Sequence, residues 1–102
     1  NSIAAVVKAK LVRNSTDIGI GDANGNRQRA TVGNYNGISN AAMIQTMAQN
    51  FIDEPSTTSA ITYKLKIATE NATLYVNRNG RNDDLARDGT YTSSITLMEV
   101  LA

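Results

Sequence analysis

The sequence predicts an all-β fold, an antiparallel sandwich or a barrel. Apolar and polar residues alternate in several segments, and Asn-Gly dipeptides mark turns along the chain. About seven candidate strands follow one another at spacings of roughly ten residues, which is typical of all-β domains. The 102 residues suffice for one small domain. We therefore expect a single β-sandwich domain over residues 1–102.

The first expected strand is IAAVVKAKLVR, residues 3–13. Apolar residues occupy every second position from Ile3 to Leu11, so they share one face of an extended chain. Lys8 and Lys10 lie between them and point to the other face. This alternation predicts a strand with one buried and one solvated face.

A hairpin is expected next, in TDIGIGDANGNRQRATVG, residues 16–33. Asn24 and Gly25 both tolerate positive φ, which a two-residue type I′ turn requires at its central positions. Alternating apolar residues flank this dipeptide on both sides, namely Ile18, Ile20, Ala30 and Val32. The pattern predicts two short strands joined by an Asn24-Gly25 turn.

Three later segments show the same period of two. The segment AITYKLKIA, residues 60–68, directs its apolar residues to one face and its lysines to the other, and ATLYVNR, residues 72–78, predicts a shorter strand. The closing run TSSITLMEVLA, residues 92–102, is apolar on both faces near its end. Such a strand fits a position between a core and a neighbouring subunit.

The segment from Ala41 to Phe51 is ambiguous. Its apolar residues recur at near-helical spacing behind a plausible Asn40 cap, and its composition favours a helix. As a strand, it would instead gather Met43, Met47 and Phe51 on one mixed face suited to a subunit contact.

The sequence carries no signature of catalysis. It contains neither His nor Cys, which excludes the usual general base, a transition-metal site and a Ser-His or Cys-His nucleophile. In the stretch NRNGRNDDLARDG, arginines neutralise the acidic residues, so it fits a solvated loop better than a calcium site or a paired-carboxylate site. The run DANGN begins like a calcium loop but lacks the later residues of that motif. We expect no enzyme, no cofactor and no bound metal.

The net charge and the size of the chain limit the classes of partner that we expect. The net charge is +1, no basic run is interleaved with aromatics, and no apolar run is long enough to span a membrane. Nucleic-acid binding and membrane insertion are therefore not expected. With one Phe, four Tyr and no Trp, the core must be built from small aliphatic residues, and oligomerisation is a common remedy for such a domain.

Four runs, in consistent order, resemble the C-terminal β domain of many structural proteins of tailed phages, especially marine and cyanobacterial ones. These runs are LVRNSTDIGIGDANGNRQRATVG (11–33), NFIDEPSTTSAITYKLKIAT (50–69), ATLYVNRNG (72–80) and SSITLMEV (93–100). Such proteins are generally described as tail-fibre, head-fibre or decoration proteins.

The resemblance implies a jelly-roll-like sandwich similar to the complement and tumour-necrosis-factor heads, assembled as a trimer with other virion proteins. Family members carry further strands ahead of the segment that matches residues 1–10. We therefore expect the chain to be the C-terminal part of a longer protein, lacking its N-terminal strands. The resemblance also favours a strand over a helix at residues 41–51.

We expect a virion structural protein, a fibre knob or capsid decoration that binds a host-surface glycan or protein. Residues expected in receptor-binding loops are Tyr35, Arg78, Arg81 and Tyr91, and those expected at the subunit interface are Met43, Met47, Phe51, Met98 and Val100. The alternative is a secreted or cell-surface β-sandwich binding module, or the subunit of an extracellular filament.

Overall fold

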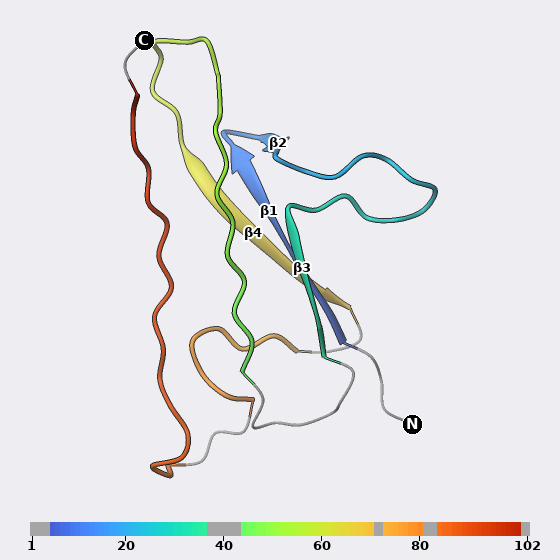
Figure 1. Cartoon of the computed structure of the whole chain (residues 1–102), viewed down its shortest axis with the longest axis vertical. Coiled ribbons are helices and arrows are strands. Elements are labelled where there is room, and N and C mark those ends of the chain that lie inside the picture. Colours follow the sequence, from blue (N-terminus) through green and yellow to red (C-terminus); the bar gives the residue numbers. More distant parts are fainter. Residues whose placement is uncertain (1–4, 37–43, 71–72, 81–83, 101–102) are drawn as a thin grey trace. The chain divides into compact units, whose positions relative to one another are not determined.

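The computed structural model describes residues 5–36, 44–70, 73–80 and 84–100. Within these ranges the chain is all-β, contains no helix and forms an antiparallel sheet, as predicted. Its four strands, drawn in Figure 1, are β1 (Ala5–Arg13), β2 (Thr16–Ile18), β3 (Val32–Asn36) and β4 (Tyr63–Glu70).

Strand β1 is the centre of this sheet. Along one edge it pairs with β4, in a register that runs from Val6 opposite Glu70 to Arg13 opposite Tyr63. Its other edge is shared: β3 pairs with the first half of β1, and β2 pairs with the last three residues. All three pairings are antiparallel, so every strand depends on β1 for its backbone hydrogen bonds.

A tight turn joins β1 to β2. Asn14 adopts a φ of 53°, a left-handed conformation that Asn tolerates better than most residues. Its backbone N–H donates to the Thr62 carbonyl over 2.7 Å, and its side-chain Oδ1 accepts from the Thr62 N–H at 3.0 Å. One residue therefore closes the turn and extends the pairing with the chain entering β4.

The predicted hairpin forms as a loop with a shifted turn. Gly25 takes a φ of 58°, and the Arg27 N–H donates to the Asn24 carbonyl over 3.2 Å. The turn is therefore centred on Gly25 and Asn26, one residue later than predicted. The Gly21 N–H donates to the Ala30 carbonyl, yet the flanking strands end at Ile18 and resume at Val32.

The alternation predicted for the first strand and for residues 61–67 is confirmed by the register. Ala9 lies opposite Ile67, and Leu11 lies opposite both Leu65 and Ile18, so these side chains share the first face of the sheet. The second face carries the lysines of β1 and β4, together with Val6 and the fully buried Val12, which lies opposite Lys64. The core is small: among the described apolar residues the buried ones are Ala9, Val12 and Ile18, whereas Leu65 is 49% exposed.

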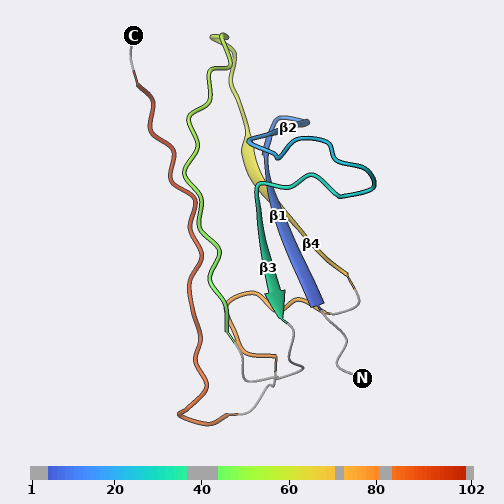
Figure 2. The same cartoon turned by 45° about the vertical axis from the view of Figure 1, so that its right-hand side comes forward.

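The segment from residue 45 to residue 62 runs as an extended chain along the first face of the sheet (Figure 2). The side-chain Nδ2 of Asn34 donates to the Thr46 carbonyl over 3.2 Å, and Asp53 contacts β1 and β4. Residues 44–51 form neither a helix nor a ladder, so the strand that the resemblance favoured and the helix that the composition favoured are both wrong there. Their polar contacts to the sheet replace the local helical hydrogen bonds that the composition favours; residues 41–43 lie outside the described ranges.

The chain divides into two compact units. The first comprises Asn1–Ser39 and Gln45–Leu74 and contains the sheet; the second comprises Asn40–Ile44 and Tyr75–Ala102. In the described part of the second unit, backbone pairing is limited to a bridge between Arg78 and Thr90. Among the described residues, the strands predicted at 72–78 and 92–102 are therefore wrong over 73–78 and 92–100, because no neighbouring strand in these ranges supplies their hydrogen bonds.

Candidate functional site

The second unit brings two of the predicted loop residues onto neighbouring backbone segments. Arg78 pairs with Thr90 in an antiparallel bridge, and the next residue, Tyr91, donates its N–H to the Asn77 carbonyl over 2.8 Å. Asn77 has a φ of 66°, and its side-chain Oδ1 accepts from the Ser93 hydroxyl at 2.6 Å. Polar side chains and backbone thus hold residues 77–79 against residues 89–93.

The Arg78 side chain is held by an aromatic ring. Its guanidinium carbon lies 4.1 Å from the centroid of the Tyr75 ring, which is the geometry of a cation–π contact. The guanidinium also donates to the Asn79 carbonyl over 3.4 Å. Arg78 is consequently positioned by Tyr75, which the sequence did not single out.

Tyr91 folds back over a glycine. A Cβ placed on Gly89 would lie 2.6 Å from the Tyr91 hydroxyl oxygen, so the phenol occupies space that only glycine leaves open. The Gly89 N–H donates to Oδ1 of the buried Asn79 over 3.4 Å. The exposed phenol and the stacked guanidinium give this loop cluster two groups able to hydrogen-bond a sugar hydroxyl.

Of the other two predicted loop residues, one belongs to the first unit and one lies outside the described residues. Tyr35 belongs to β3 in the first unit, where its backbone pairs with Val6. Arg81 lies outside the described residues. Of the four predicted residues, the described structure therefore places Arg78 and Tyr91 together.

The predicted interface residues differ in exposure. Met47 is half-buried, and Phe51 is 46% exposed with its ring packed against Gly19. In the second unit, Met98 and Val100 are 86% and 88% exposed. Met43 lies outside the described residues.

A group of three residues in the first unit was missed by the sequence analysis. The Asp53 carboxylate receives one hydrogen bond from Arg13 Nη1 and a second from the Tyr63 hydroxyl, the latter over 2.7 Å. Arg13 and Tyr63 are register partners on β1 and β4, whereas Asp53 comes from the extended segment. The signal was present in the sequence, because Arg13 continues the apolar face of the first strand and a cation there requires an acidic partner.

These contacts shift the titration of two groups. Burial of the Asp53 carboxyl favours its neutral form, but the hydrogen bonds from Arg13 and Tyr63 outweigh burial and hold the pKa of Asp53 below 3.8. The pKa of Tyr63 is raised above 10.0, chiefly because its hydroxyl donates to the Asp53 carboxylate. Asp53 therefore stays ionised and is a structural anion that fastens the extended segment to the sheet.

The described residues contain no cluster of three acidic side chains able to hold a metal ion. Across the same ranges, no helix has the length and apolar character needed to cross a bilayer. No protein-family model matches the sequence, and no curated protein or solved structure matches it either.

Proposed function

We propose that the chain is a structural module of a tailed-phage particle, a trimeric jelly-roll fibre knob or capsid decoration with a host-surface-binding role. On this proposal it is located on the virion and contacts other virion proteins. The resemblance of residues 11–33, 50–69, 72–80 and 93–100 to such domains supports the proposal, and so does the all-β architecture. No catalytic role is proposed.

The main support for the proposal is that apolar side chains are exposed on extended segments that do not pair with a strand. Ile52 is 86% exposed in the first unit, and Leu97, Met98 and Val100 are more than half exposed in the second. Exposed apolar surface on extended backbone without ladder partners is suited to association, because a neighbour can supply both burial and hydrogen bonds. A closed homo-oligomer provides both for every copy.

A second candidate is the subunit of an extracellular filament or another surface-located β module. The observation that favours it is the outer edge of β4, which in the described residues pairs with β1 alone and so leaves a free edge. Such an edge can accept a strand from the next copy in a head-to-tail contact. Symmetry separates the two candidates, since a trimer closes and a filament does not.

The mass of the particle in solution tests the proposal. Multi-angle light scattering should give three times the 10.9 kDa of one chain, with a mass that holds as the protein is diluted. A mass that grows with concentration without limit would favour the filament. A monomer at all concentrations would overturn both candidates.

A further inference from the structure

The second face of the sheet concentrates positive charge. Lys8 and Lys10 of β1 lie on this face together with Lys64 and Lys66 of β4. In the register Lys10 is directly opposite Lys66, and the other two lysines occupy diagonal positions. Neighbouring lysines on this face, along one strand or directly across from each other, have backbone positions about 5–7 Å apart. The diagonal pairs are about 7–8 Å apart.

The clustering of lysines on this face does not stabilise the sheet. Like charges directly opposite each other on an antiparallel pair are destabilising. Asp17 offsets part of this charge through an ion pair of 2.9 Å with Lys10. Lys64 and Lys66 have no ion-pair partner among the described residues. Residues that lower the stability of the fold and gain no compensating contact are expected at functional surfaces.

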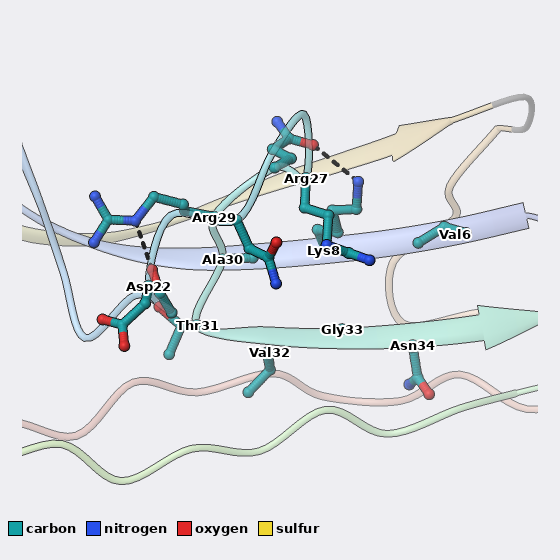
Figure 3. A pocket seen from close by; sticks show the side chains of 13 residues that line it. Val6, Lys8, Asp22, Arg27, Arg29, Ala30, Thr31, Val32, Gly33 and Asn34 are labelled. Carbon is teal, nitrogen blue, oxygen red and sulfur yellow. Dashed lines mark hydrogen bonds between the residues drawn. The ribbon is translucent and has the colours of Figure 1, made fainter.

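The loop between β2 and β3 extends the charged face into a groove. Gln28 Oε1 accepts a hydrogen bond of 3.2 Å from Lys8 Nζ, which brings the loop against the face (Figure 3). Arg27 and Arg29 line the same groove, and Arg29 is fixed by donating to the Gly21 carbonyl. The groove is open and has a volume of about 690 Å³.

The charge on this face exceeds that of the whole chain. The face and its loop hold six of the ten cationic side chains, namely Lys8, Lys10, Arg27, Arg29, Lys64 and Lys66. Three of the nine acidic ones accompany them, Asp17, Asp22 and Glu70. The resulting local charge of about +3 within a chain of net charge +1 creates an attraction for anions confined to one side of the first unit.

The groove also offers neutral and acidic hydrogen-bonding groups. Asn24 and Gln28 contribute side-chain amides, and Asp22 contributes a carboxylate. Amides both donate and accept, and a carboxylate accepts, so together they suit the hydroxyls of a sugar. None of the groove-lining residues whose side chains the structure describes is aromatic, whereas sites for single-stranded nucleic acid use aromatic side chains as stacking platforms.

We propose that this lysine face and groove bind an anionic polysaccharide. Sulfate, phosphate or carboxylate substituents would pair with the lysines and arginines, while ring hydroxyls would bond the amides and Asp22. The inference builds on the proposed surface role and names its ligand class. It assigns that ligand to residues of the first unit and does not involve the Arg78–Tyr91 loop cluster of the second unit.

Binding of dextran sulfate, measured by calorimetry over a series of salt concentrations, tests the proposal. We expect dextran sulfate to bind with an affinity that falls steadily as salt rises, and neutral dextran of the same length not to bind. Lys66→Glu should weaken binding about tenfold or more, because it replaces an attraction by a repulsion. The same substitution should leave the unfolding midpoint unchanged or raise it, since a carboxylate would then face Lys10.

Arg87→Glu is the matched control, because it makes the same charge change at an exposed residue of the second unit. It should alter the affinity by less than about twofold. Equal losses for both variants, or no binding of dextran sulfate, would overturn the proposal. Tighter binding of an oligothymidylate than of dextran sulfate would replace it by a nucleic-acid interface. Light scattering tests the proposed oligomer independently of this binding experiment. A protein that forms the trimer but does not bind dextran sulfate would therefore overturn the polysaccharide proposal alone.

Discussion

Arg13 and Asp53 form an ion pair between residues that are 40 positions apart in the sequence. The pair joins the last residue of β1 to the extended segment, and Tyr63 on β4 completes it through a second hydrogen bond to the same carboxylate. The Asp53 side chain is 14% exposed, so the pair is better shielded from water than a surface salt bridge. It is the main polar link between the extended segment and the end of the sheet.

Replacing Asp53 should therefore cost stability. Asp53→Asn removes the charge that Arg13 faces, and we expect the free energy of unfolding to fall by about 1–3 kcal/mol, the usual range for a hydrogen bond to a charged group. Urea denaturation followed by circular dichroism measures this change. Asp17→Asn is the control: it breaks the more exposed pair with Lys10 and should cost less than about 1 kcal/mol. Equal costs would show that the Asp53 pair has no special role.

The same pair predicts a loss of stability in acid. Because the pKa of Asp53 is lower in the folded chain than its ordinary value of 3.8, folding favours the ionised carboxylate. This contribution is fully present above pH 3.8 and is lost as the pH falls through the folded-state pKa. Unfolding midpoints measured from pH 6 downward should drop in this range for the natural chain and drop less for Asp53→Asn. Glu54→Gln alters the neighbouring exposed carboxyl, and its unfolding midpoint should fall with pH as that of the natural chain does. If the midpoint of Asp53→Asn fell equally, Asp53 would not be the cause of the acid sensitivity.

Replacing each of three glycines in the loop between β2 and β3 by alanine should lower the stability by different amounts. Gly19 and Gly25 both have a φ of 58°, but a Cβ on Gly19 would lie 3.0 Å from Phe51 Cδ2, while a Cβ on Gly25 meets nothing within 4 Å. Gly25→Ala should cost about 1–2 kcal/mol for the left-handed conformation alone. Gly19→Ala should cost more, because Phe51 must also move.

Gly21→Ala completes the series, because its φ is not in the left-handed region and its nearest neighbour is a carbonyl oxygen at 3.9 Å. Thermal unfolding of the three variants should rank Gly21→Ala as the mildest and Gly19→Ala as the most severe. A Gly19→Ala variant no less stable than Gly25→Ala would mean that Phe51 does not pack on Gly19 in solution.

The sequence predicted those features of the fold that depend on neighbours along the chain. Alternation alone placed Lys8 and Lys10 on one side of the first strand and Val7, Ala9 and Leu11 on the other, because successive side chains of a strand point to opposite faces. The buried Val12 lies on the lysine side, which alternation did not predict. The same rule grouped Leu65 with Ile67. The turn in the loop after β2 is displaced by one residue because, of the Asn-Gly dipeptide, Gly25 alone takes positive φ and occupies the first central position, where a type II′ turn places glycine.

Features that depend on pairing between distant strands could not be predicted in this way. The opposition of Lys10 and Lys66 exists only in one register of β1 against β4, and alternation does not choose between registers that differ by two residues. The contact of Asp53 with Arg13 likewise requires the extended segment to cross the sheet. The runs around Leu74 and Ile95 alternate as strands do but form no ladder within the described residues, because period two shows that a segment can pair and not that a partner is present.

The exposed apolar residues give the last prediction, which separates association from folding. Met98→Asp and Ile52→Asp each place a charge where the side chain is 86% exposed in a single copy, so the fold of that copy should be unaffected. If these side chains are buried between copies, the charge must be desolvated there and the assembly should dissociate. Light scattering should then report the 10.9 kDa monomer, with an unchanged circular dichroism spectrum. Thr58→Asp adds the same charge at an exposed polar residue and should keep the mass of the natural protein. An assembly that survives both apolar substitutions would place the subunit contact elsewhere on the chain.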